Sequence, residues 1–230
     1  MEQLGLVPIF TFNIGSFQVL ITKEIIWQWV AIVILGISAF LLTRNLNSRK
    51  PSKKQVALEM LYESIEGLVK GNMGDDFLNF VPYVGTLMVY LCVLNLSGLI
   101  GIAPPTKCLG VTFGLGLSTF LVLNFTALKR NGVKGYFKAF VKPFTLFLPI
   151  NIMERIVLPC SLALRLFGNM LAGTILIDLV YNALSKFLWV SGIGIPIILH
   201  GYFDIFDGLI QVLVFSFLTM ANIKVIAEHN

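Results

Sequence analysis

Residues 161–173 have the sequence SLALRLFGNMLAG, which places Arg165 in the middle of an apolar run from Ile156 to Val180. An arginine keeps its charge in a protein. A charge at bilayer depth is costly unless a partner or water receives it. The segment therefore predicts a membrane helix whose arginine has a functional role.

The whole chain has the composition of an integral membrane protein. Of its 230 residues, 57% are hydrophobic and only 13% are charged, whereas about a quarter of the residues of a soluble domain are charged. A bilayer core of ~30 Å needs about 20 apolar residues for each helical crossing. We expect an all-α membrane protein with about five transmembrane helices, at Ile25–Leu42, Phe80–Ile102, Leu109–Leu128, Leu148–Leu184 and Gly194–Ile226.

The last two apolar segments are longer than one membrane crossing requires. As single helices they would extend about 55 Å and about 50 Å, at 1.5 Å per residue. Such helices must tilt steeply or bend, and Pro159 and Pro196 provide bend points. We expect residues 148–228 to form a long, steeply tilted helical hairpin that is joined through Ser185–Ile193.

Lysines and arginines cluster in two connections between the expected spans. By the positive-inside rule, the basic loops at residues 44–75 and 129–147 are cytoplasmic, and the N-terminal segment of residues 1–24 is extracytoplasmic. The C-terminus is then cytoplasmic, and the chain forms a single membrane domain over residues 1–230. Within the first loop, Lys53–Lys70 has the spacing of an amphipathic helix, which either lies on the headgroups as a connector or binds a partner.

Polar side chains form a stripe on each helix of the expected hairpin. At 100° per residue, the members of each stripe fall on one helix face. At bilayer depth such groups face a bundle interior, a water-filled cavity or a partner of opposite charge. The first stripe contains Glu154, Ser161, Arg165 and Asn169, and the second contains His200, Asp204, Asp207, Gln211 and Asn222.

Two interpretations of these stripes stay open from the residues alone. Arg165 either forms a structural ion pair with Asp178, Asp204 or Asp207, or it takes part in ion transfer. Aligned acidic, imidazole and amide groups can bind or relay a proton or cation in turn. The sequence contains no phosphate loop, nucleophile–base pair or metal-ligand spacing, and its three cysteines lack paired spacing. We therefore expect no cofactor, no metal and no disulfide.

Residues 161–173 closely resemble the signature of subunit a of rotary F-type ATP synthases. Three further stretches support the resemblance: VYLCVLNLSGLIG at 89–101, LPINIME at 148–154 and FDIFDGLIQVLVFSFLTMANI at 203–223. The resemblance implies a stator subunit of the membrane motor Fo that is not an enzyme on its own. It implies a ring of c subunits against the hairpin, peripheral-stalk b subunits near residues 53–70 and the basic loops, and surrounding membrane lipid.

The resemblance also implies roles for individual residues. Arg165 corresponds to the stator arginine, which favours the ionised form of a carboxylate on each passing c subunit. Asn169 is its neighbour on the rotor-facing side, Gln211 faces it from the last helix, and Glu154 and Asp204 belong to two aqueous half-channels.

One position departs from the family pattern. Thr174 stands where many members carry an acid or a histidine, so we expect Asp178, Asp204, Asp207 or His200 to supply that contribution. The coupling ion, H⁺ or Na⁺, stays open because the c subunits chiefly coordinate it. The alternative function is a secondary transporter or ion channel in which Arg165 binds an anionic substrate, although the paired repeats common in transporters are not visible in the sequence.

Overall fold

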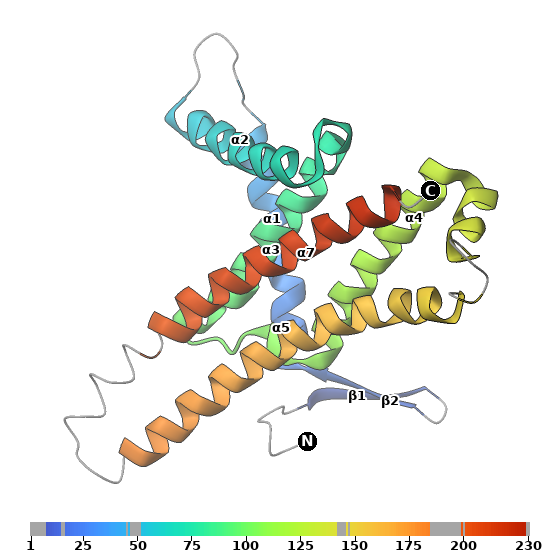
Figure 1. Cartoon of the computed structure of the whole chain (residues 1–230). Helices are drawn as coiled ribbons and strands as arrows, with labels where there is room; N and C mark the ends of the chain where they lie inside the picture. The colour runs from blue at the N-terminus through green and yellow to red at the C-terminus, as the bar shows by residue number, and fades with distance from the viewer. Residues whose placement is uncertain are drawn as a thin grey trace.

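The computed structural model describes residues 8–14, 17–44, 46, 52–141, 146, 148–184, 199 and 201–228 (Figure 1). Within these residues, five segments are long and apolar enough to cross a membrane, which confirms the expected number of spans. They are Lys23–Thr43, Asp75–Ile100, Leu109–Tyr136, Leu148–Leu184 and Gly201–Ala227.

The chain begins with two strands that the sequence analysis did not anticipate. Strand β1 (Pro8–Ile14) pairs antiparallel with β2 (Phe17–Thr22), with Phe12 opposite Val19. Phe10, Phe12 and Ile14 alternate with polar residues in β1, and that period of two is typical of strands. The sequence analysis assigned no structure to residues 1–24, and the membrane spans are helical as expected.

Helix α1 (Lys23–Thr43) lies at the edge of the bundle and packs against α3. Of its apolar side chains only Ala31 is fully buried, whereas Ile32, Val33 and Phe40 are exposed. Because the span is apolar and few of its side chains contact the rest of the chain, most of its surface is available to lipid or to other subunits.

Helix α2 (Lys53–Met73) is amphipathic, and its apolar face packs against α3 and α7. Ile65, Val69 and Met73, which follow one another at four-residue spacing, are buried. The helix ends at Gly74, whose φ of 98° suits glycine. Just after this glycine, the Asp75 carboxylate lies 2.8 Å from the Lys70 ammonium of α2. The hydrogen bond and the charge attraction between them raise the pKa of Lys70.

Three short turns connect the next spans. A 3₁₀ turn (η2, Asp75–Phe80) leads into α3 (Val81–Asn95), and η3 (Leu96–Ile100) and η4 (Pro105–Lys107) form the tight connection to α4. Helix α4 (Leu109–Val141) bends at Gly132, where φ is 66°. The second basic connection, residues 129–147, was expected as a loop. The structure shows instead that the chain is helical as far as Val141, on both sides of Gly132.

Helices α4 and α5 (Leu148–Leu184) approach each other closely at Gly116. A Cβ atom at this position would lie 2.6 Å from the Pro159 carbonyl oxygen and 3.3 Å from the Ala163 Cβ. The small residues on both helices allow this backbone contact, which fixes α5 against the upright part of the bundle.

The last two helices lie side by side in opposite directions and oblique to α1, α3 and α4 (Figure 1). Helix α5 has the bounds that the sequence predicts, and α7 (Gly208–Glu228) follows a π-helical segment, η6 (Gly201–Asp207). The expected joining residues, 185–193, and Pro196 lie outside the described residues. This arrangement is the long, tilted hairpin that the segment lengths require.

Two apolar clusters hold the spans together. One joins α2, α3, α4 and α7 and includes Phe77, Leu123 and Met220. The other joins α1, α3, α4, α5 and α7 and includes Leu91 and Leu166. Both clusters place α7 at the centre of the bundle, so its buried polar residues are held in fixed positions.

Candidate functional site

The two polar stripes meet where Asn169 on α5 faces Gln211 on α7. The Asn169 side-chain amide donates a hydrogen bond of 2.8 Å to the Gln211 Oε1. Asn169 is exposed, whereas Gln211 is only 2% exposed and its Nε2 has no acceptor among the described residues. The exposed Asn169 amide can also bond to water or to a partner subunit, whereas the unpaired Gln211 Nε2 is buried within the bundle.

Arg165 lies one helical turn before Asn169, on the same side of α5. It is exposed, while Leu162 and Leu166, which lie within about 100° of it around the helix, are buried in the bundle. Within the described part of the chain, no carboxylate lies at ion-pair distance from Arg165. The guanidinium is therefore accessible at the surface of the bundle, and Ser161, one turn earlier, is also exposed.

The acidic residues before the last helix lie in the segment that precedes Gln211. Asp204 and Asp207 belong to the π-helical segment, and both are half-buried. The Asp204 carboxyl group lies against Gly98, where an added Cβ would approach its Cγ to 2.9 Å. Asp178 is exposed on α5, and His200 lies outside the described residues.

Asn95, at the end of α3, connects this region to the loop before α4. Its side-chain amide donates to the Gly208 carbonyl at 3.1 Å, and Thr106 donates to the Asn95 Oδ1 at 3.1 Å. Asn95 and Thr106 are fully buried. Buried polar groups that satisfy each other fix the geometry around them, so this network sets where α7 begins.

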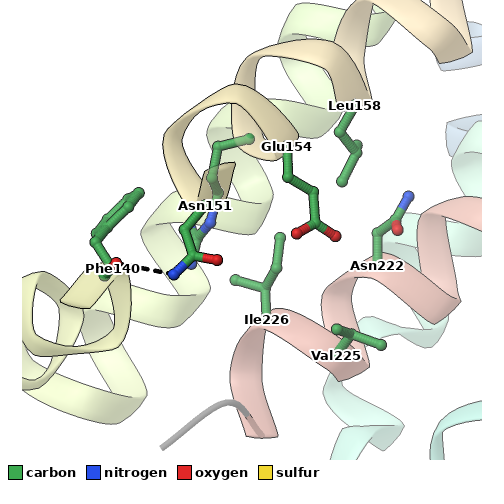
Figure 2. A pocket seen from close by; sticks show the side chains of 8 residues that line it. Phe140, Asn151, Glu154, Leu158, Asn222, Val225 and Ile226 are labelled. Carbon is green, nitrogen blue, oxygen red and sulfur yellow. Dashed lines mark hydrogen bonds between the residues drawn. The ribbon is translucent and has the colours of Figure 1, made fainter. Parts of the chain in front are cut away.

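A small cavity lies at the other end of the hairpin, between α4, α5 and α7 (Figure 2). The Glu154 carboxylate points from α5 into this space, and Asn222 faces it from α7. The cavity has a volume of about 80 Å³, which is room for a few water molecules. Glu154 and Asn222 therefore share a polar space that is separate from the Asp204 region.

Arg155, beside Glu154, was not predicted as a site residue from the sequence. Its guanidinium donates to the Asn124 Oδ1 at 3.1 Å and lies 5.3 Å from the Tyr136 ring and 4.9 Å from the Phe140 ring. Tyr136 also donates to Asn124, at 2.7 Å. The isolated polar Asn124 within an apolar span was the one sequence signal for this cluster, which forms a wall of the cavity.

The structure thus brings some predicted site residues together and separates others. Asn169 and Gln211 are in contact, and Glu154 and Asn222 line one cavity. The five spans and the charged and amide side chains at bilayer depth define a multi-pass α-helical membrane protein of the ion-transporting class.

Comparison with known proteins narrows this class to one family. The sequence model of the family described as ATP synthase A chain matches residues 25–224. The chain belongs to this family. It is the ion-translocating stator subunit of Fo, which carries H⁺ or Na⁺, and it is a non-catalytic part of the ATP synthase complex.

Its relatives are named as the same subunit. The chain is 34% identical over 209 residues to ATP synthase subunit a of Desulforamulus reducens, a match that covers 90% of this chain and 80% of the relative. It is 32% identical over 217 residues to the subunit a of Moorella thermoacetica, with 94% of each chain covered. It is 30% identical over 226 residues to a subunit a of Propionigenium modestum described as sodium ion specific, with 91% and 75% covered.

Proposed function

We propose that Arg165 is the fixed charge past which the carboxylates of a c-subunit ring move. The observation that carries this proposal is its position: exposed on α5, one turn from the Asn169–Gln211 hydrogen bond, with no carboxylate of the described chain at ion-pair distance. Because a charge at this depth needs a counter-charge or water, its partner is expected on another subunit.

The charge of Arg165 would couple ion release to rotation. A c-subunit carboxylate must be neutral while it faces lipid, because burying an isolated charge there is prohibitive. Near Arg165 its ionised form is favoured, so it releases its ion into one half-channel and reloads from the other. Arg165 also blocks the direct passage of ions from one half-channel to the other. The transmembrane potential contributes about 2.3 kcal/mol for each elementary charge per 100 mV. This free energy drives the rotation of the c-subunit ring.

The two half-channels would lie at opposite ends of the hairpin. One includes the cavity between Glu154 and Asn222, near the start of α5. The other includes Asp204 and Asp207 before α7, together with Asp178 and with His200, which the structure does not describe. The separation of these polar regions along α5 and α7 supports two paths that meet at the Arg165 surface rather than one continuous pore.

Partners and orientation follow from the charge distribution. The basic connections at residues 44–75 and 129–147 are proposed to face the cytoplasm, with residues 1–24 outside and the C-terminus inside. The exposed side of α2 is then on the cytoplasmic surface. The peripheral-stalk b subunits are then expected to lie near this surface and the basic connections.

Replacing the arginine tests the stator role. In membranes that contain the complete complex, Arg165→Ala should reduce ATP-driven ion pumping to background, while the detached soluble head still hydrolyses ATP. Lys23→Ala, which removes an exposed cation at the start of α1 and outside the basic connections, is the control and should pump normally. Normal pumping by the Arg165 variant would contradict the assignment.

A further inference from the structure

A groove of about 730 Å³ lies along α4, beside the segment that joins α2 to α3. Leu121, Val122 and Phe125 line its apolar part, and Lys129 and Arg130 line its other end. Leu121 is 61% exposed and Phe125 is 68% exposed, so the groove is open to the surroundings of the protein.

The order of these residues along α4 matches the layers of a membrane leaflet. Lys129 follows Leu121 by about 12 Å along the helix, at 1.5 Å per residue. Half of the hydrocarbon core is ~15 Å thick. When the lysine is level with the headgroups, Leu121 and Phe125 are therefore at the depth of the acyl chains.

Arg130 is held in place at the polar end of the groove. Its guanidinium lies 4.0 Å from the centre of the Phe77 ring and donates a hydrogen bond of 3.0 Å to the Asp76 carbonyl. Phe77 is 2% exposed, so it provides a rigid support. A guanidinium has five N–H donors in a planar fork that suits phosphate, and the remaining donors are available to a ligand.

The charges at this end favour an anionic headgroup. Lys129 is exposed and has no hydrogen-bond or ion-pair partner in the described part of the chain. Asp76 contributes one carboxylate to the lining and Asn79 contributes an uncharged amide. Two cations against one acid leave a net positive charge, which attracts an anionic lipid more strongly than a zwitterionic one.

We propose that this groove binds an anionic phospholipid. The phosphate lies between Arg130 and Lys129, and one acyl chain follows Leu121, Val122 and Phe125. The site is separate from the ion path, because none of these residues belongs to the α5 or α7 polar stripes. The proposal is therefore independent of the role assigned to Arg165.

Photo-crosslinking in the complete complex tests the site. The purified ATP synthase is placed in nanodiscs with phosphatidylglycerol or phosphatidylcholine that carry the same photoreactive acyl chain, and labelled peptides are mapped by mass spectrometry. Phosphatidylglycerol should label residues 121–126 several-fold more than phosphatidylcholine. Lys129→Gln should reduce phosphatidylglycerol labelling about five-fold, the effect expected of one cation near the surface.

The controls separate charge, shape and folding. Lys134→Gln removes an exposed α4 lysine that is not part of the groove lining, and it should leave labelling unchanged. Leu121→Trp fills the apolar end without changing charge and should reduce labelling by both lipids. Arg130→Gln is a secondary variant, because it also removes the contact with buried Phe77.

Three outcomes would overturn the proposal. Equal labelling by the two lipids would show that the groove does not select charge. Unchanged labelling in Lys129→Gln would show that the headgroup is not bound at this end. Absence of label from residues 121–126 in the complete complex would show that another subunit covers the groove.

Discussion

Gly116 determines how closely α5 can approach the upright helices. Any side chain there meets the Pro159 carbonyl oxygen, which would lie 2.6 Å from an added Cβ. Gly114 is on the same helix, but an added Cβ there meets nothing within 4 Å. The two glycines therefore form a matched pair with the same backbone cost and different surroundings.

The pair leads to opposite predictions for stability. Gly116→Ala should lower the stability of the chain by about 1–3 kcal/mol, because the two backbones must move apart. Gly114→Ala should be neutral or stabilising by up to about 1 kcal/mol, because alanine favours the helix. Thermal unfolding of the purified complex measures both, and equal effects would exclude the close contact as the cause.

Gln211 provides a second test, through charge. Gln211→Glu places a carboxylate opposite Asn169, one turn from Arg165, and this permanent counter-charge in the same chain should weaken the attraction of Arg165 for the c-subunit carboxylate. ATP-driven pumping should fall at least ten-fold.

Gln211→Leu serves as the control of similar size. It removes the hydrogen bond to Asn169 without adding a charge, so it should retain more pumping than the glutamate variant. The charge argument fails if the leucine variant is the more impaired of the two. Pumping is measured in inverted membrane vesicles for both.

Individual contacts were predictable only where helical spacing determines them. The regular spacing places Asn169 and Arg165 on one face of α5, and the structure pairs Asn169 with Gln211. The contact of Asp204 with Gly98 depends on how the π-helical segment meets η3. The spacing of residues within either segment does not predict the contact between Asp204 and Gly98.

At the scale of elements, α4 is bent at Gly132 and the bent part packs on the start of α5. Arg155 holds the bend, because it contacts the rings of Tyr136 and Phe140 and shares Asn124 with the Tyr136 hydroxyl. A guanidinium over two aromatic rings contributes about 0.5–2 kcal/mol for each contact, depending on its hydration.

We expect Arg155→Gln to destabilise this bend. The variant loses both ring contacts, and it should lower the unfolding temperature by several degrees and raise the reactivity of a cysteine at position 154 toward water-soluble thiol reagents. Tyr136→Phe, which loses one hydrogen bond worth about 1 kcal/mol, should have a smaller effect. An unchanged unfolding temperature in Arg155→Gln would show that the bend does not depend on it.

Long apolar segments were predictable as elements, and short or composite ones were not. The bounds of α5 follow from one long and predominantly apolar segment. The N-terminal strands are too short for their alternation to stand out in a chain of membrane spans. The helical segment after Gly132 was not predicted, because its lysines indicated a connection between spans rather than part of a helix.

For the whole molecule, five spans and two basic connections define a testable orientation. A reporter that is active only in the cytoplasm, fused after Asn230, should be active. The same reporter inserted between Pro104 and Cys108, in the opposite connection, should be inactive. The reverse pattern would invert the proposed orientation and the sides assigned to both half-channels.

The overall architecture could be predicted because the bilayer restricts it strongly. Span number follows from composition, and the oblique hairpin follows from segments too long to cross upright. The order of contacts between spans does not follow, because lipid is as apolar as the side chains and the pattern of hydrophobicity does not identify the buried face. The central position of α7 is known only from the structure.

The edge position of α1 has a consequence for the time course of synthesis. Glu24, at its first turn, is 7% exposed, and its carboxylate lies 3.9 Å from the Lys107 ammonium. That lysine is made about 80 residues later, roughly 4–16 s at ordinary translation rates. During this interval the Glu24 carboxylate must either stay hydrated or be protonated. The N-terminal end of α1 can therefore settle into its final position only after Lys107, between the second and third spans, has been made.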